Sequence, residues 1–80
     1  MPHYDFLWND EIIDHIAQHG VTPEEFECVV RNPQRLETSE SSGLPIAFGP
    51  DSAGEIIACV YDVHQEITVI PVTAYRTEEL

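Results

Sequence analysis

Residues 20–33 read GVTPEEFECVVRNP, and this stretch decides the fold because it contains nearly every signal that starts and stops a helix. Thr22 is a preferred N-cap residue, and Pro23 suits the first helical position. Glu25 follows the cap by three residues, as a capping box requires. The stretch therefore predicts a helix that starts at Pro23. Its buried stripe is predicted to consist of Phe26, Val29 and Val30.

A second helix is predicted just before this one. Asn9 is a suitable N-cap, acidic residues follow it, and Gly20 supplies a stop, so this helix should run from about Asp10 to His19. Asn32-Pro33 ends the later helix, because proline disfavours helical geometry in the residue before it. The two segments form a helical hairpin. The apolar stripe of the earlier helix is predicted to be Ile12, Ile13, Ile16 and Ala17.

After Pro33 the hydrophobic period changes from 3.6 to 2, which indicates strands. We therefore predict one α+β domain over residues 1–80: a short N-terminal strand, then a two-helix hairpin packed on an antiparallel sheet of three to four strands. Pro71 predicts a bulge or an edge within the last strand. The predicted strands are His3–Trp8 before the helices, and Gln34–Ser39, Leu44–Phe48, Glu55–Val63 and Glu66–Tyr75 after them.

The last two predicted strands are apolar on both faces, a pattern typical of strands that are covered on both sides. The two helices can cover one face of the sheet. No other segment is obvious as a cover for the second face, so the sequence predicts either a tightly curled sheet or a second polypeptide. We expect self-association, giving a homo-oligomer, or a protein partner.

A chain of 80 residues and 9.0 kDa accommodates one small core. Its apolar runs are too short for a membrane span, which needs roughly 20 residues, and no signal peptide opens the chain. We therefore expect a cytoplasmic protein without membrane association. Cys28 and Cys59 both lie in apolar runs and are predicted to be buried free thiols, with a disulfide or a reactive thiol as the alternative.

Charge is the most unusual global property: 15 Asp and Glu stand against three Arg and no Lys, giving a net charge of −12 at pH 7. Nucleic-acid binding draws much of its affinity from cations that neutralise phosphates, so this charge disfavours RNA as a ligand. The same charge favours a basic protein partner or a bound cation.

Several short motifs resemble those of the BrnT-type toxins of bacterial toxin–antitoxin pairs. The resemblance rests on Phe-x-Trp-Asn-Asp at 6–10, His-Gly-Val at 19–21, Pro-Glu-Glu-Phe at 23–26, Asn-Pro at 32–33, IIACVYD at 56–62 and ITVIPVTAYR at 67–76. It spans nearly the whole chain. It implies an α+β fold related to the RelE-like ribonucleases, with RNA cleavage in active members and neutralisation by an antitoxin that covers the toxin.

This chain departs from that family at two places where family members carry positive charge. Members usually carry a Lys early in the first helix, where this chain has Ile12 and Ile13. Their last strand typically ends in Thr-Ala-Arg or Ser-Ala-Arg, whereas residues 73–76 read TAYR, one residue late. Because side chains alternate along a strand, we expect the Arg76 guanidinium to point to the opposite face.

RNA cleavage without a metal ion needs a base, an acid and a cation beside the phosphate. His19 or His15 is the candidate base, since an unperturbed imidazole titrates near pH 6.5. Tyr75 or the other histidine is the candidate acid, and Arg76 is the candidate cation. His19 also suits a structural role, because an imidazolium stabilises the last carbonyls of a helix. The helical periodicity predicts that His19 is half buried and His15 more exposed.

Histidines at positions i and i+4 can also hold one metal ion, with Asp14, Glu11 or His64 completing the site. No cysteine lies nearby in sequence and the HExxH motif is absent, so we expect neither a metal nor another cofactor. Three functions compete. The sequence favours a protein-binding module or self-associating scaffold of BrnT-like ancestry with weak or no RNA cleavage. The alternatives are an active ribonuclease toxin bound by a basic antitoxin, and a small metal- or ligand-binding protein that uses His15 and His19.

Overall fold

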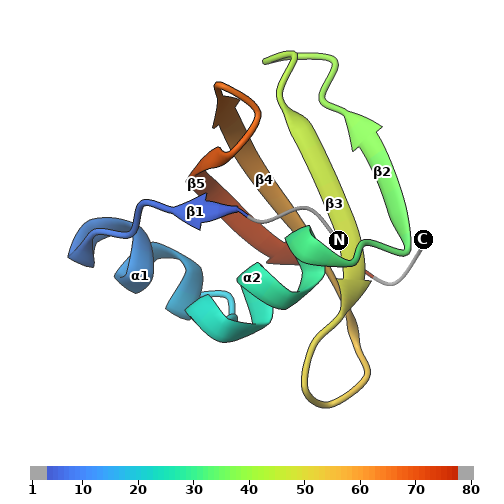
Figure 1. Cartoon of the computed structure of the whole chain (residues 1–80). Coiled ribbons are helices and arrows are strands. Elements are labelled where there is room, and N and C mark those ends of the chain that lie inside the picture. Colours follow the sequence, from blue (N-terminus) through green and yellow to red (C-terminus); the bar gives the residue numbers. More distant parts are fainter. Residues whose placement is uncertain (1–3, 78–80) are drawn as a thin grey trace.

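The computed structural model describes residues 4–77, which form two helices and five strands (Figure 1). The α+β class predicted from the sequence is confirmed. His3, the first residue of the predicted N-terminal strand, lies outside the described residues. The elements are β1 (Asp5–Phe6), α1 (Asp10–Ala17), α2 (Pro23–Arg31), β2 (Arg35–Thr38), β3 (Pro45–Pro50), β4 (Ile56–His64) and β5 (Thr68–Arg76).

The strands form one mixed sheet in the order β1-β5-β4-β3-β2. Strands β2 to β5 each pair antiparallel with the next strand along the chain, as the predicted antiparallel sheet requires. The prediction of three to four antiparallel strands is wrong, because β1 joins the sheet as a fifth strand and pairs in parallel with β5, Asp5 opposite Thr68. This pairing joins distant segments, so no turn signal announces it.

Both helices start as predicted, and α1 is shorter than predicted. At α2 the Glu25 N–H donates to the Thr22 hydroxyl (3.1 Å) and the Thr22 N–H donates to the Glu25 carboxylate (2.9 Å), which confirms the capping box. At α1 the Asn9 side chain accepts from the N–H of Ile12 (2.8 Å). Helix α1 ends at Ala17, two residues before His19, and Gly20 follows with a φ of +75°, which suits glycine.

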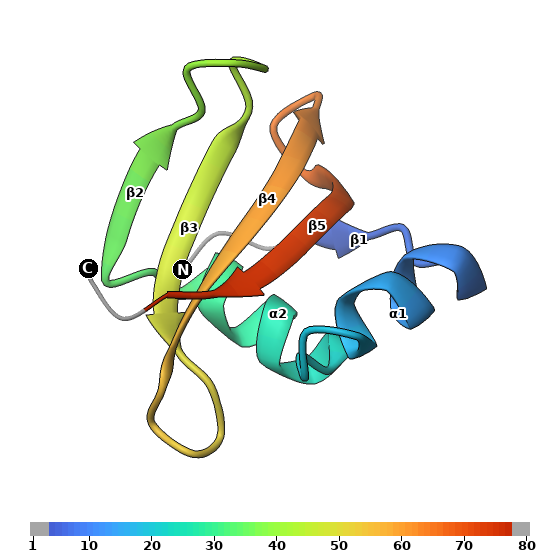
Figure 2. The ribbon, with the colours of Figure 1, turned by 180° about the vertical axis from the view of Figure 1, so that it is seen from behind.

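The helices pack against one face of the sheet. Helix α2 contacts β3 and β4, whereas α1 lies beside β5, and Figure 2 shows the opposite face without a covering helix. Of the predicted α1 stripe, Ile16 is buried and Ala17 is exposed, since α1 meets the edge of the sheet. Neither helix within residues 4–77 has the length and apolar character that crossing a membrane requires. The core contains Ile16, Val21, Phe26, Val29, Val30, Ala47, Ile57, Cys59, Tyr61, Val69 and Ala74.

A bulge in β5 decides which side chains share a face. Val60 pairs with Thr73 but the next residue, Tyr61, pairs with Pro71, so β5 carries an extra residue, Val72. The bulge predicted from Pro71 is thus confirmed. Beyond it, Arg76 lies opposite Ile57 on the helix-covered face of the sheet.

Candidate functional site

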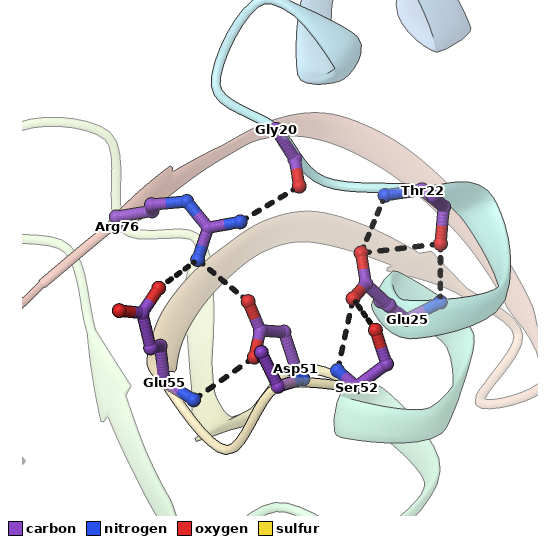
Figure 3. Close-up of polar contacts among 8 residues, drawn as sticks. Gly20, Thr22, Glu25, Asp51, Ser52, Glu55 and Arg76 are labelled. Atoms are coloured by element: carbon purple, nitrogen blue, oxygen red, sulfur yellow. Dashed lines mark hydrogen bonds and ion pairs between the residues drawn. The ribbon is translucent and has the colours of Figure 1, made fainter.

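Arg76, at the end of β5, joins three segments of the chain (Figure 3). Its guanidinium contacts the Asp51 carboxylate (2.6 Å) and the Glu55 carboxylate (3.2 Å) through Nη1, and Nη2 donates to the carbonyl of Gly20 (2.8 Å). The Asp51 side chain is only 2% exposed and also accepts from the N–H groups of Ala53 and Glu55, both at 2.9 Å. Arg76 therefore ties the β3–β4 turn to the loop between the helices.

The charges of this cluster stabilise each other. The hydrogen bond from Arg76 is the main cause that lowers the pKa of Asp51, and the N–H of Glu55 adds to the effect. The same contact with Asp51 raises the pKa of Arg76. Both groups are charged at neutral pH, so two carboxylates already neutralise the guanidinium that the sequence offers for a phosphate.

Glu25 extends the cluster to α2. Besides capping the helix, its carboxylate accepts from the N–H (2.9 Å) and the hydroxyl (2.7 Å) of Ser52 (Figure 3). The N–H of Ser52 is the main cause that lowers the pKa of Glu25. The β3–β4 turn is thus held from two sides, by Arg76 and by the start of α2.

The two candidate histidines lie together at the end of α1. Their rings meet edge to face with centroids 5.7 Å apart, and Nε2 of His15 lies 2.8 Å from the hydroxyl of Thr73 on β5. Both residues are exposed, so the expectation of a half-buried His19 is wrong. Arg76 is bonded to the carbonyl of Gly20, the residue after His19, so the two histidines and this backbone contact of Arg76 all lie around the end of α1.

Tyr75 is not part of that group. It precedes Arg76 on β5 and pairs with Ala58, so its side chain lies on the opposite face of the sheet from the guanidinium. Its side chain is 38% exposed. The acid role proposed for Tyr75 is therefore separated by the sheet from the cation role proposed for Arg76.

Each of the three arginines contacts a carboxylate. Arg31 lies 3.4 Å from Glu27 and Arg35 lies 2.6 Å from Glu37, alongside the Arg76 cluster. Arg31 also stacks over the ring of Phe6, at 5.1 Å from the ring centroid. The sequence contains no lysine, so no arginine or lysine side chain is left without a carboxylate for a polyanion.

The face of the sheet opposite the helices has an apolar centre, with Arg35 and Glu37 on one side of it and Asp62 and Thr73 on the other. The strand register places Phe48 beside Ala58, Ile46 beside Val60, and Tyr75 on the other side of Ala58. Ala58 and Val60 are 0% and 8% exposed. We call this surface the helix-free face. Its apolar residues are Ile46, Phe48, Ile56, Ala58, Val60, Ile70 and Tyr75.

The structure also bears on metal and thiol sites. Within residues 4–77, no group of three or more His, Cys, Asp or Glu side chains is placed to hold a metal ion. Both cysteines are free, but Cys28 is exposed, so the prediction that both are buried is half wrong. Burial raises the pKa of Cys59 to about 12. A surface hollow of about 500 Å³ beside Arg76 is lined by Glu55, Ile56, Arg76 and Thr77.

Comparison with known proteins returned no match to any protein-family model, curated protein or solved structure.

Sequence reasoning missed the acidic partners of Arg76. Asp51 is the first residue after β3, and an aspartate at the start of a turn signals a side chain that bonds to the turn's own N–H groups. That signal predicts the bonds to Ala53 and Glu55. The ion pair with Arg76 joins residues 25 apart and has no local signal.

Proposed function

We propose that this chain is a protein-binding module of BrnT-like, toxin–antitoxin ancestry, and that its helix-free face binds a basic segment of a partner protein with little or no RNA cleavage. The observation that carries the proposal is the apolar centre of this sheet face on a protein of net charge −12. Apolar contact would supply affinity, and the surrounding negative charge would select and attract a cationic partner.

The pairing of the arginines supports binding to protein over binding to RNA. A phosphate would have to displace Asp51 and Glu55 from Arg76, or Glu37 from Arg35. Exchanging one anion for another gains little electrostatic energy, and the remaining carboxylates would repel the phosphate backbone. A basic peptide meets no such barrier.

A basic peptide of alternating character tests this proposal. The probe is a labelled peptide of about ten residues that alternates Lys and Val, because side chains of an extended peptide alternate between its two sides. The matched peptide alternates Lys and Ser and has equal charge. Fluorescence anisotropy should show at least about tenfold tighter binding of the Lys/Val peptide, a difference of about 1.4 kcal/mol.

Variants then locate the binding surface. Phe48→Thr and Tyr75→Thr should each remove most of the preference for the Lys/Val peptide, since each removes a large apolar contact worth about 1.5–3 kcal/mol when fully buried. Leu36→Thr is the matched control, because Leu36 is 58% exposed and pairs with the core residue Ala47, on the other face of the sheet. Equal binding of the two peptides, or equal loss in all three variants, would contradict the proposal.

Ribonuclease activity is the second candidate function, and the contact between His15 and His19 near Arg76 favours it. Its test is cleavage of a labelled single-stranded RNA by the purified protein. Cleavage that His19→Ala abolishes, without loss of stability, would support this alternative. Absence of cleavage at any pH near the imidazole pKa would exclude it for that RNA.

A further inference from the structure

Among the described residues 4–77, strand β2 forms one edge of the sheet and has a neighbour on one side only, β3. All four of its residues are exposed, including Leu36, whose side chain is 58% exposed. An edge strand presents unpaired N–H and C=O groups that can pair with another strand. The sequence of this edge determines which strand fits it.

The ladder with β3 indicates which backbone groups point outward. The N–H of Ser39 donates to the carbonyl of Leu44 (2.8 Å), and in an antiparallel ladder bonded residues alternate with unbonded ones. Glu37 and Arg35 therefore bond toward β3, and Thr38, which lies opposite Pro45, does not. Leu36 and Thr38 direct their N–H and C=O groups away from the sheet.

The side chains of this edge are self-complementary. Arg35 and Glu37 lie on one face of β2 and already form an ion pair at 2.6 Å, whereas Leu36 lies on the other face. We propose that a second copy of this chain pairs antiparallel with β2, about a two-fold axis at Leu36. Leu36 then lies opposite Leu36 of the second copy and exchanges both backbone hydrogen bonds with it. Arg35 of each copy lies opposite Glu37 of the other.

The charges select this register over its neighbours. A slip by two residues in one direction places Arg35 opposite Arg35 of the second copy, and a slip in the other direction places Glu37 opposite Glu37. Like charges directly opposite each other in a sheet are destabilising, so only the register centred on Leu36 is favourable. Pairing of this kind is isologous and closes at two copies.

The dimer joins the two sheets edge to edge. Arg35 and Glu37 lie on the same face of the sheet as Phe48 and Ile46, so the helix-free faces of the two copies become one continuous surface. Two chains of −12 repel each other over long distances, so the dimer should be weak at low ionic strength and tighter at about 0.15 M salt. The inference is independent of the proposed function, because a monomer presents the same helix-free face.

Charge exchange at the edge strand tests the dimer. Sedimentation velocity over a concentration series measures the association of the wild type, of Arg35→Glu and of Glu37→Arg. Each variant alone places like charges opposite each other and should associate at least tenfold more weakly than the wild type. An equimolar mixture of the two variants restores opposite charges at both positions, so it should regain the dimer.

All variants change exposed side chains, and circular dichroism checks that each remains folded. Leu36→Lys should also weaken association, whereas Leu7→Lys, an equally apolar exposed site in another part of the chain, should not. A wild type that stays monomeric up to about 1 mM overturns the inference. So does a mixture that fails to restore association, or a dimer that the single variants leave unchanged.

Discussion

Replacing Gly49 by alanine should show how tightly α2 is held against the sheet. Gly49 lies in β3 opposite Ile57, and a Cβ at this position would lie 3.2 Å and 3.3 Å from the two γ-methyls of Val29 on α2. Carbon atoms pack best at about 3.5–4.0 Å. Rotation of Val29 about χ1 would turn only one of the two methyls away, and valine in a helix has one strongly preferred χ1 rotamer, so we expect α2 to move outward instead.

The expected cost follows from two opposing terms. Overpacking a core by one methyl typically costs about 1–3 kcal/mol, and replacing glycine recovers about 0.4–1 kcal/mol by restricting the unfolded chain. Gly49→Ala should therefore lower the free energy of unfolding by about 1 kcal/mol. Val29→Ala should lower it by about 2 kcal/mol, since Val29 is 2% exposed and each buried methyl contributes about 0.8 kcal/mol besides the cavity left behind.

A double-mutant cycle by urea unfolding measures the coupling. The methyl group that Gly49→Ala introduces fills part of the space that Val29→Ala vacates, so the double variant should be more stable than the sum of the two losses predicts, by about 1 kcal/mol. Additive losses, or a Gly49→Ala variant more stable than the wild type, would refute the close packing of α2 on β3.

Three further predictions concern single groups. The pKa of Asp51 is lowered in the folded state, so the stability it contributes is present above its ordinary value of 3.8 and is lost as pH falls through the lower folded-state value. Urea unfolding should therefore show that Asp51→Asn has a lower free energy of unfolding than the wild type at pH 7, and that this difference shrinks at acid pH. A difference in free energy that stays constant with pH would contradict the ion pair. Glu66 has a φ of +69°, so Glu66→Gly should raise the free energy of unfolding by about 1 kcal/mol, and an unchanged urea midpoint would argue against this turn. A thiol reagent should modify only Cys28 in the folded protein and reach Cys59 after unfolding, because Cys59 is buried, and rapid modification of both would contradict its burial.

The parts of this fold that follow from local chemistry could be predicted from sequence. Helix α2 is one such part, because its capping box joins Thr22 to Glu25 over a single turn. The bulge is another, since Pro71 lacks the N–H that a continuous ladder needs. Local rules were sufficient for the hairpins of β2 to β5 as well.

The parts that depend on distant contacts could not be predicted. The parallel pairing of β1 with β5 joins residues more than 60 positions apart, so the sheet gained a strand that its turn signals do not announce. Cys28 is exposed because it points away from the stripe of Phe26 and Val29 on α2. The helical period indicates this direction, but the prediction relied on the fact that thiols are usually buried.

For the candidate site, the sequence supplied the residues but not their grouping. It placed His15 and His19 one turn apart, and the structure confirms their contact. It could not show that Asp51 neutralises Arg76, because that contact joins distant parts of the chain. That Tyr75 and Arg76 point to opposite faces follows from alternation along one strand, so the sequence could have predicted it.

Induced expression in a bacterial host tests the proposed function most directly. Growth and cellular RNA are compared between the wild-type chain and a His19→Ala, Arg76→Ala double variant. A binding module predicts unimpaired growth and abundant soluble wild-type protein. Growth arrest with loss of RNA, caused by the wild type but not by the double variant, would contradict it and establish a ribonuclease.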